Sequence, residues 1–579
     1  MKKRKYIFVT GGVMSGVGKG IAASSIALIL KARGLQVTAL KIDPYINVDA
    51  GTMNPTEHGE VFVLNDGDET DQDMGNYERF LDTTLSRVNY LTTGRVYLEV
   101  IRKERNLEYK GKNVEVVPDV PLEVIGRIEK AAENADADVT VIEIGGTIGE
   151  YQNIIFLEAA RMLKSKYPDD VAIVMVSYLP MPSKIGEMKT KPTQTAARTL
   201  NSVGLQADVI IARSEVSLDQ KRKDKIALFC NIRPENIIAA PDVESIYDVP
   251  INFEKDHLGE ILCKVLKINH KKRVTNLSKW SDFVSKVKKP RGKVSIAIIG
   301  KYFNSGDFVV SDVYISVIEA LKFSAFTLGR KPVITYLNSK DFETGETGKT
   351  GVAGKTGTAG KLKLSELDKY DGVLVPGGFG ATGVEGKIKA IEYVRKHKIP
   401  YFGLCYGMQL AVVEFARNVL KWKDAHTTEV DSKSTHPVID IMPEQKDNLA
   451  ESKYGATMRL GAYPCVLKKG TIASKAYSLA GAKIAGAKIA KNGGKIISER
   501  HRHRYEVNPD FIEEIEKAGL VFSGISPDRR LMEIAELPRN IHPFFLGVQF
   551  HPEFLARPLS PHPLFTAFVK AAIEKGKGK

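Results

Sequence analysis

Residues 6–20 read Tyr-Ile-Phe-Val-Thr-Gly-Gly-Val-Met-Ser-Gly-Val-Gly-Lys-Gly, and they decide the fold class of the first half of the chain. The apolar run from Tyr6 to Val9 predicts a strand, and the pattern after the glycines predicts a helix over Ile21 to Arg33. Glycines at such a turn let backbone N–H groups approach phosphate oxygens, while the helix N-terminus and Lys19 supply positive charge. The segment therefore predicts a phosphate-binding loop. A glycine-rich turn without a ligand is the alternative, because Val13 and Gly20 depart from the Walker A pattern.

The same alternation of strand and helix patterns extends to both halves of the chain. It predicts an α/β domain over residues 1–268, a basic polar linker over 269–292, and a second α/β domain over 293–579. Low-complexity stretches near 344–361 and 480–490 are expected to be insertions. The fold class is thus α/β, with two parallel-sheet domains whose strands are expected at residues 6–9, 37–42, 139–144, 171–176, 209–211, 294–299, 372–375, 401–404 and 547–550.

Composition excludes several classes of protein. The 579 residues exceed what one core usually holds, and no apolar run reaches the roughly 18 to 20 residues that cross a bilayer. The four cysteines have neither metal-ligand spacing nor the density of a disulfide framework, which suits a reducing cytoplasm. The net charge of +15 lies largely in lysine-rich connectors and is not interleaved with aromatic residues. We expect a cytoplasmic protein with no membrane and no nucleic-acid partner.

Two carboxylates are candidate magnesium ligands beside the predicted phosphate loop. Asp73 stands in Glu-Thr-Asp-Gln-Asp, and Glu143 ends the predicted strand 139–144. Ligands gather at the carboxyl ends of strands in open α/β sheets, and Mg²⁺ prefers oxygen donors. For a single acidic residue an exposed surface position is the commoner alternative, but a carboxylate that ends a buried strand has little structural reason to be there.

The second domain carries a predicted cysteine nucleophile. The segment Tyr401 to Gln409 places Cys405 in a tight turn between a strand and a helix, with glycine two residues before and after it. Such a turn pushes the sulfur out of the sheet, and the helix N-terminus that follows stabilises a thiolate. A free cysteine is more often an inert buried residue, but the two flanking glycines argue against that alternative here. In Gln-Phe-His-Pro-Glu, His551 and Glu553 point to the same side of an extended segment, so the carboxylate can orient the imidazole that activates Cys405. The glycine-rich residues 376–380 predict an oxyanion hole.

Alternating histidines and arginines over residues 500–504 resemble metal ligands on a strand. Three neighbouring cations would repel a metal ion, so we expect the arginines to bind an acidic substrate group instead.

With these motifs the chain resembles the CTP synthase family over nearly its whole length, with an N-terminal synthetase domain and a class I glutamine amidotransferase domain. The matching blocks are Lys41 to Asp49, His58 to Phe62, Lys189 to Gln194, Lys225 to Cys230, Met458 to Gly461 and Glu499 to Asn508. The resemblance implies a synthetase domain of the P-loop-like, dethiobiotin-synthetase-like type.

The resemblance also implies a role for each matching residue. ATP would be held by Gly16, Val17, Gly18, Lys19, Gly20, Ile21, Lys41, Asp73 and Val243, with magnesium on Asp73 and Glu143. UTP, and CTP as feedback inhibitor, would be bound by Ser15, Glu150, Tyr151, Gln152, Lys189, Thr190, Lys191, Pro192, Thr193, Gln194 and Lys225. The glutaminase triad would be Cys405, His551 and Glu553, and glutamine would be held by Gly378, Tyr406, Gly407, Met408, Gln409, Glu429 and Arg504. His58 would line an ammonia channel.

The implied reaction is ATP-dependent amination of UTP to CTP, the final step of CTP biosynthesis. Uracil O4 would be phosphorylated, ammonia released from glutamine would pass through an internal channel, and GTP would act as allosteric activator of a homotetramer.

The sequence departs from the family's pattern at two places that affect these expectations. Residues 150–152 replace the family's Asp-Ile-Glu, and Thr382 replaces an arginine associated with the GTP response. A cobyric acid synthase and a catalytically idle scaffold paralogue are the rival readings.

Overall fold

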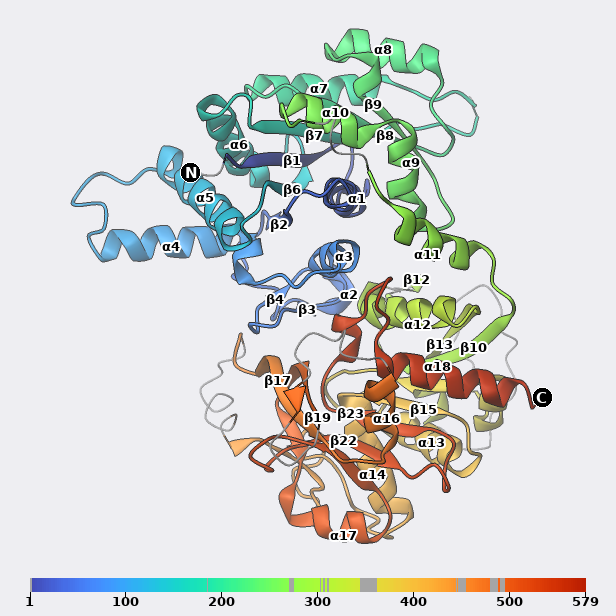
Figure 1. The fold of residues 1–579 in the computed structure, drawn as a ribbon. Helices are drawn as coiled ribbons and strands as arrows, with labels where there is room; N and C mark the ends of the chain where they lie inside the picture. The colour runs from blue at the N-terminus through green and yellow to red at the C-terminus, as the bar shows by residue number, and fades with distance from the viewer. Residues whose placement is uncertain are drawn as a thin grey trace. The chain divides into compact units, whose positions relative to one another are not determined.

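The computed structural model describes residues 3–184, 186–269, 275–301, 304–305, 308–309, 312–343, 362–443, 445, 455–479, 488–489 and 495–578. The chain divides into two compact units (Figure 1): Met1–Ala50 with Asp73–Val284, and Gly51–Gln72 with Ser285–Lys579. The short segment Gly51–Gln72 thus belongs to the second unit, although both of its neighbours in sequence belong to the first. The predicted insertions lie outside the described residues, apart from 488–489.

The first unit is built on a seven-stranded sheet in which all neighbours pair in parallel, in the order β5-β2-β6-β1-β7-β8-β9. The five predicted strands of this half are confirmed. Two edge strands were not predicted, because β5 has only three residues and β9 only five. The strands are β1 (Lys5–Gly12), β2 (Val37–Asp43), β5 (Tyr90–Thr92), β6 (Val139–Thr147), β7 (Val171–Tyr178), β8 (Val209–Ser214) and β9 (Ile237–Pro241).

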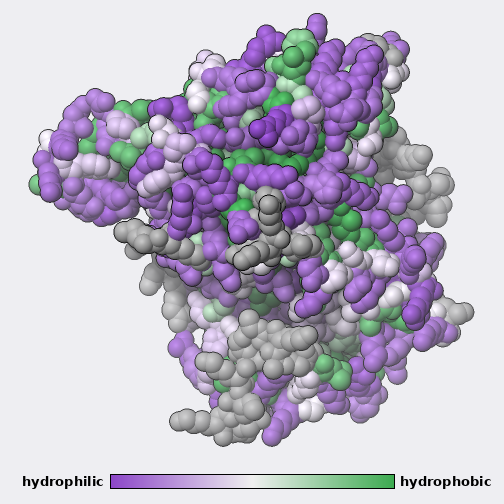
Figure 2. Space-filling model, turned by 45° about the horizontal axis from the view of Figure 1, so that its top comes forward, coloured by the Kyte–Doolittle hydropathy of each residue, from purple (hydrophilic) through white to green (hydrophobic). Residues whose placement is uncertain are grey.

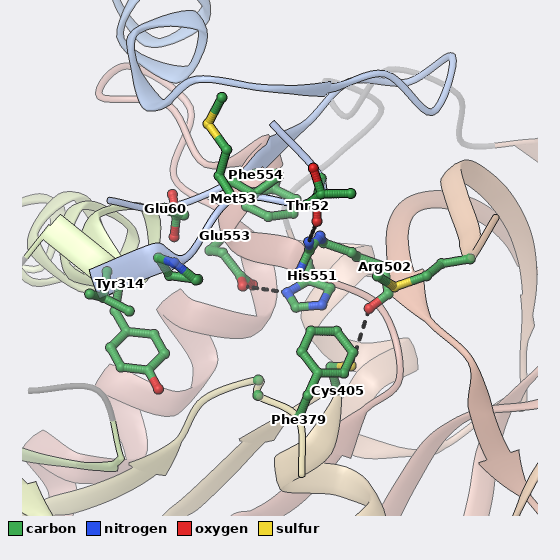
Figure 3. A pocket seen from close by; sticks show the side chains of 17 residues that line it. Thr52, Met53, Glu60, Tyr314, Phe379, Cys405, Arg502, His551, Glu553 and Phe554 are labelled. Atoms are coloured by element: carbon green, nitrogen blue, oxygen red, sulfur yellow. Dashed lines mark hydrogen bonds and ion pairs between the residues drawn. The ribbon is translucent and has the colours of Figure 1, made fainter. Parts of the chain in front are cut away.

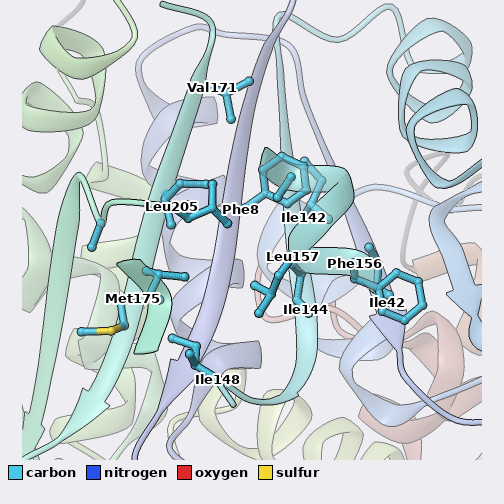
Figure 4. Packing of buried hydrophobic residues seen from close by; sticks show 14 of the residues in the cluster. Phe8, Ile42, Ile142, Ile144, Ile148, Phe156, Leu157, Val171, Met175 and Leu205 are labelled. Atoms are coloured by element: carbon cyan, nitrogen blue, oxygen red, sulfur yellow. The ribbon is translucent and has the colours of Figure 1, made fainter. Parts of the chain in front are cut away.

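Buried apolar side chains fix this sheet between helices. Phe8, Ile142 and Ile144 extend from one face, and Phe156 and Leu157 of α6 pack against them (Figure 4). Because side chains alternate along a strand, the residues between these point to the opposite face of the sheet, where α1 packs together with α9 and α10. The helices of this unit are α1 (Lys19–Ala32), α3 (Gln72–Leu81, from Asp73 on), α4 (Thr93–Arg105), α5 (Val116–Asn134), α6 (Ile154–Lys166), α7 (Lys191–Ser202), α8 (Gln220–Cys230), α9 (Val249–Lys255), α10 (Leu258–Val265) and the part of α11 (Ser278–Lys288) up to Val284.

The helix α11 lies within the stretch expected to be a linker. Trp280 is buried, donates from Nε1 to the Tyr247 carbonyl at 2.8 Å, and packs against Phe80 and Phe283. This aromatic cluster attaches the start of α11 to the first unit.

The second unit contains a ten-stranded sheet in the order β13-β10-β14-β15-β23-β22-β21-β17-β19-β18. Its first five strands are parallel, and the remaining neighbours pair antiparallel. Four strands of the parallel part, β10, β14, β15 and β23, match predicted strands, although β23 ends at Val548, two residues before the predicted end. The edge strand β13 was not predicted. The strands are β13 (Lys331–Asn338), β10 (Lys293–Gly300), β14 (Gly372–Val375), β15 (Tyr401–Leu404), β23 (Phe545–Val548), β22 (Met532–Leu537), β21 (Val521–Ile525), β17 (Arg459–Leu467), β19 (Lys495–His503) and β18 (Lys488–Ile489).

Helices and short hairpins complete the second unit. The helices are α2 (Pro55–His58), α12 (Ile315–Thr327), α13 (Val384–Lys396), α14 (Tyr406–Asn418), α16 (Ile472–Leu479), α17 (Ile512–Lys517) and α18 (Pro563–Gly576), and the two-stranded sheets are β3 (Phe62–Val63) with β4 (Glu69–Thr70), β11 (Asn304–Ser305) with β12 (Phe308–Val309), and β16 (Ile439–Ile441) with β20 (Tyr505–Val507). No helix in the described ranges is long and apolar enough to span a membrane. Hydrophilic side chains cover most of the face shown in Figure 2.

Candidate functional site

The predicted phosphate loop lies between β1 and α1, with Gly18 capping the helix and Lys19 as its first residue. Lys19 is buried. Burial lowers its pKa, the nearby carboxylate of Glu143 raises it, and Lys41 lowers it again, with a net fall. A lysine at this helix N-terminus, partly desolvated, is suited to bind a phosphate group.

The two predicted magnesium ligands, Asp73 and Glu143, both contact the side chain of Lys41. Lys41 Nζ lies 3.0 Å from Glu143 Oε1 and also contacts the Asp73 carboxylate, and the Tyr77 hydroxyl donates to Glu143. Burial raises the pKa of Glu143; burial also acts to raise that of Asp73, but Lys41 brings it below its usual value. No cluster of three or more His, Cys, Asp or Glu side chains able to hold a metal occurs in the described ranges. Mg²⁺ at nucleotide sites usually needs only one or two carboxylates, with phosphates and water as its other ligands, so this pair fits such an ion.

The glycine at position 20 makes this arrangement possible. A Cβ at Gly20 would overlap the Asp73 carboxylate, with Cγ of Asp73 only 2.7 Å away. The hydroxyl residue expected there in a Walker A motif would collide with Asp73, which explains why position 20 is a glycine instead.

A cavity of about 190 Å³ adjoins the loop and brings together residues that are far apart in sequence. Gly18 and Ile21 of the loop face Val243, and Asn252 adds an amide to an otherwise mainly apolar lining. Three of the predicted ATP-binding residues therefore line one cavity of a size and polarity suited to a planar heterocycle.

Two of the predicted pyrimidine-nucleotide residues, Lys189 and Lys225, form a basic cluster with Arg222 around Glu187. Lys189 lies 2.7 Å from the Glu187 carboxylate, and Lys189, Arg222 and Lys225 together lower the pKa of that carboxyl. Thr190 caps α7, where it accepts from Gln194 Nε2 at 3.1 Å. Lys191 and Pro192 open this helix, and the Thr193 hydroxyl bonds that of Ser177 at 2.8 Å. Ser15, Tyr151 and Gln152 are exposed and Glu150 is half-buried.

Cys405 occupies the strained turn that the sequence predicts. It follows β15, precedes α14 and has φ of 48° and ψ of −101°, a conformation that non-glycine residues rarely adopt. Its N–H donates to the Val548 carbonyl at 2.6 Å, and its sulfur lies 3.8 Å from the Arg502 carbonyl. Strands on both sides of the turn therefore hold the sulfur in place.

His551 and Glu553 pair as predicted. His551 Nδ1 lies 2.7 Å from Glu553 Oε1, and the imidazole stacks on Phe554 (Figure 3). Burial lowers the pKa of His551, but Glu553 and Cys405 outweigh that effect and raise it to about 10. The site thus favours a protonated imidazole beside Cys405.

These three side chains line one cavity of about 240 Å³ within the second unit. Part of its wall comes from the segment Gly51–Gln72, namely Gly51, Thr52, Met53, Pro55, Glu60 and Val61 (Figure 3). His58 does not line it, and its side chain is exposed.

The glycine-rich loop 376–380 forms the opposite wall. Gly377 and Gly378 line the cavity, and a Cβ at Gly377 would lie 2.9 Å from His551 Cε1. The Gly380 N–H donates to Glu429 at 2.6 Å, so that donor is already used. Burial raises the pKa of Glu429.

Four of the other predicted glutamine-binding residues, Tyr406 to Gln409, form the first turn of α14, and Arg504 directly follows β19. Tyr406 donates from its hydroxyl to the Gly380 carbonyl at 3.2 Å, and Gly407 accepts from Tyr401 at 2.8 Å. Met408 and Gln409 are buried. Arg504 donates to Gln445 Oε1 at 2.6 Å.

The expectation that the arginines of β19 bind an acidic substrate group is wrong for Arg500. Arg500 is fully buried and donates to Asn65 Oδ1 at 2.6 Å and to the Val63 carbonyl at 3.0 Å. Arg502 forms an ion pair with Glu69 at 2.8 Å. Both side chains bind the segment Gly51–Gln72, where the buried Val63 carbonyl and the buried Glu69 carboxylate would otherwise lose these partners.

Two further residues beside the nucleophile were not predicted. Gln549 Nε2 lies 3.7 Å from Cys405 Sγ, and Lys387 is a fully buried lysine whose Nζ has no hydrogen-bond partner among the described residues. Gln549 precedes the histidine motif and could have been suspected from that position. Lys387 stands on a helix with no local signal that distinguishes it from a surface lysine.

Two family models match the chain. Residues 5–268 match the family model described as CTP synthase N-terminus, and residues 309–571 match the model described as glutamine amidotransferase class-I. A CTP synthase of Thermococcus gammatolerans is 48% identical over 576 residues, covering 99% of both chains, and one of Pyrococcus furiosus is 49% identical over 572 residues, covering 98% of both. A solved Trypanosoma brucei CTPS glutaminase domain with bound acivicin shows 36% identity and a TM-score of 0.40, covering 49% of this chain and 94% of that one.

Proposed function

The chain belongs to the CTP synthase family of glutamine-hydrolysing ligases, and on that premise we propose how its residues carry out the ATP-dependent amination of UTP. The observation that carries the proposal is the cavity in which Cys405, His551 and Glu553 meet.

In the glutaminase unit, Cys405 is the nucleophile. Its thiolate attacks the side-chain amide carbon of glutamine, and His551 gives its proton to the departing ammonia. Water then hydrolyses the thioester with His551 as base, which releases glutamate. Glu553 keeps the imidazole oriented and stabilises its charge. Gly378, the backbone of Tyr406 to Gln409, Glu429 and Arg504 hold the glutamine.

In the synthetase unit, the loop from Gly16 to Ile21 holds the ATP phosphates, and the cavity at Val243 receives the adenine. Asp73 and Glu143 would hold Mg²⁺, which neutralises phosphate charge when it is bound. Lys19 and Lys41 add to that neutralisation. Uracil O4 takes the γ-phosphoryl group and ADP leaves; ammonia then adds at C4 and phosphate departs, giving CTP.

We further propose an internal channel for ammonia, because ammonia released into neutral water would be protonated and lose its nucleophilicity. The 240 Å³ cavity that holds Cys405 is its starting point. The exposed position of His58 gives no direct support to a role there.

Regulation and assembly follow the family. UTP, and CTP as feedback inhibitor, bind the basic cluster of Lys189 and Lys225, while Glu150, Tyr151 and Gln152 alter the balance between them. The enzyme is a homotetramer, a proposal supported by exposed apolar residues on α4 and α5, among them Leu98, Ile101 and Leu122. Sedimentation with and without UTP and ATP tests the tetramer.

GTP activates the enzyme weakly, because Thr382 replaces the family arginine.

The direct test is to incubate the enzyme with UTP, ATP, Mg²⁺ and glutamine and to measure CTP. Equal amounts of CTP and glutamate are expected. Glutamate without CTP would refute the synthetase assignment, and absence of both products would refute the proposed function.

A further inference from the structure

Gln549 is a buried side chain beside the nucleophile to which the triad gives no role. It directly follows β23 and stands two residues before His551. Its Nε2 lies 3.7 Å from Cys405 Sγ, within reach of an N–H···S hydrogen bond. Its own backbone N–H donates to the Glu533 carbonyl at 2.9 Å, so the main chain at this position is held by the neighbouring strand.

The orientation of the Gln549 amide is fixed by a second amide. Gln409 Nε2 donates to the Tyr505 carbonyl at 2.9 Å and to Gln549 Oε1 at 3.3 Å. A backbone carbonyl can only accept, so Nε2 of Gln409, and not Oε1, must face the Tyr505 carbonyl. The second hydrogen on Nε2 then needs an acceptor, so the atom of Gln549 that faces it is the oxygen. The nitrogen of Gln549 is left facing the sulfur.

We propose that Gln549 is a further catalytic residue of the glutaminase site, which donates an N–H to the Cys405 thiolate and so keeps the nucleophile ionised and aimed at the substrate. The inference rests on the proposed function of Cys405. An N–H donor to an ionised sulfur stabilises the thiolate over the thiol, because only the charged form makes a strong hydrogen bond. The helix N-terminus of α14 supplies part of the same stabilisation.

Other charged groups also act on this sulfur. His551 and Glu553 approach from the segment after β23, Lys387 acts electrostatically from α13, and Arg502 of β19 lines the cavity. All four are unchanged in Gln549→Met, so a change in its thiol ionisation reports on the loss of the amide.

The test is the pH dependence of Cys405 alkylation by iodoacetamide in the full-length enzyme, followed by peptide mass spectrometry. Gln549→Met keeps the length of the side chain without its donor, and Gln549→Glu keeps its shape but turns an oxygen toward the sulfur. We expect the alkylation midpoint to rise by about one pH unit in Gln549→Met, a tenfold loss of thiolate, and by more in Gln549→Glu. Gln409→Met should cause a smaller rise, and adding it to Gln549→Met should change nothing further.

The matched control is Gln206→Met, because that amide donates to the Cys230 carbonyl at 2.8 Å in the first unit. Its midpoint should equal that of the unmodified enzyme, and synthesis from ammonium should persist in every variant. Unchanged midpoints in both Gln549 variants, or slower alkylation at every pH without a shift, would overturn the inference. Failure of Cys405 to react with a glutamine analogue in the unmodified enzyme would instead overturn the proposed function.

Discussion

His551 Nδ1 lies 2.7 Å from Glu553 Oε1, and both side chains are buried in the cavity that contains Cys405. The ion pair raises the pKa of the imidazole to about 10 despite its burial. The geometry therefore links the reactivity of Cys405 to a carboxylate that does not touch the sulfur.

Glu553→Gln should slow glutamine hydrolysis by roughly 10²–10⁴-fold, because a neutral amide neither stabilises the imidazolium nor fixes its tautomer. Synthesis of CTP from ammonium should be unchanged. The two rates are measured side by side with saturating UTP and ATP. Equal loss of both rates would assign Glu553 a structural role.

The same variant should be destabilised in a pH-dependent way. The pKa of His551 rises from 6.5 to about 10 on folding, so its contribution to stability is complete below about pH 6.5 and disappears as pH rises through 10. Thermal melting should show the largest difference from the unmodified enzyme at pH 6. A difference that grows toward pH 10 would contradict this sign.

Gly20→Ala tests the contact between the phosphate loop and Asp73. Alanine normally stabilises a helix by about 0.5–1 kcal/mol relative to glycine. Here its Cβ would displace the Asp73 carboxylate, so synthesis from either nitrogen source should fall by at least tenfold. Gly126→Ala is the matched control, because a Cβ there meets nothing within 4 Å; it should be active and slightly more stable. Full activity of Gly20→Ala would place the metal ligands elsewhere.

Lys387→Met should stabilise the enzyme at neutral and acidic pH. Burial lowers the pKa of Lys387 from 10.5 to about 7, so the cost of charging it is complete below pH 7 and vanishes above 10.5. The gain should be on the order of 3 kcal/mol at pH 6 and near zero at pH 10.5. Lys389→Met on the same helix, whose Nζ donates to the Glu343 carbonyl at 2.6 Å, should give no such gain. Destabilisation of Lys387→Met at pH 6 would show that the contact of the ammonium with the Tyr406 ring, whose centroid lies 5.4 Å from Nζ, outweighs the cost of charging it.

Thr382→Arg tests the proposed weakness of the GTP response. Thr382 is exposed one residue before the glycine that caps α13. An arginine there would add a bidentate donor, so half-activation of glutamine hydrolysis by GTP should occur at a roughly tenfold lower concentration. Synthesis from ammonium should not change. Strong activation of the unmodified enzyme by micromolar GTP would contradict the expectation.

Local patterns were sufficient to predict the two strand-to-helix turns, because the glycines around Lys19 and Cys405 lie within a few residues of the strands that they follow. The role of Arg500 could not be predicted, since its partner Asn65 is 435 residues away and is brought there by tertiary packing. The antiparallel half of the second sheet was missed for a related reason, because its strands, such as β17 and β19, interrupt their apolar residues with polar side chains that find buried partners. Lys387 carries no local signal, since only the packing of α13 makes that lysine buried.

The central claim is that Cys405 supplies ammonia to a separate synthetase reaction. The most direct measurement compares CTP formation by Cys405→Ala with glutamine and with ammonium as the nitrogen source. The account predicts no CTP from glutamine and the rate of the unmodified enzyme from ammonium. CTP formation from glutamine by Cys405→Ala, or loss of both activities in a folded variant, would contradict it.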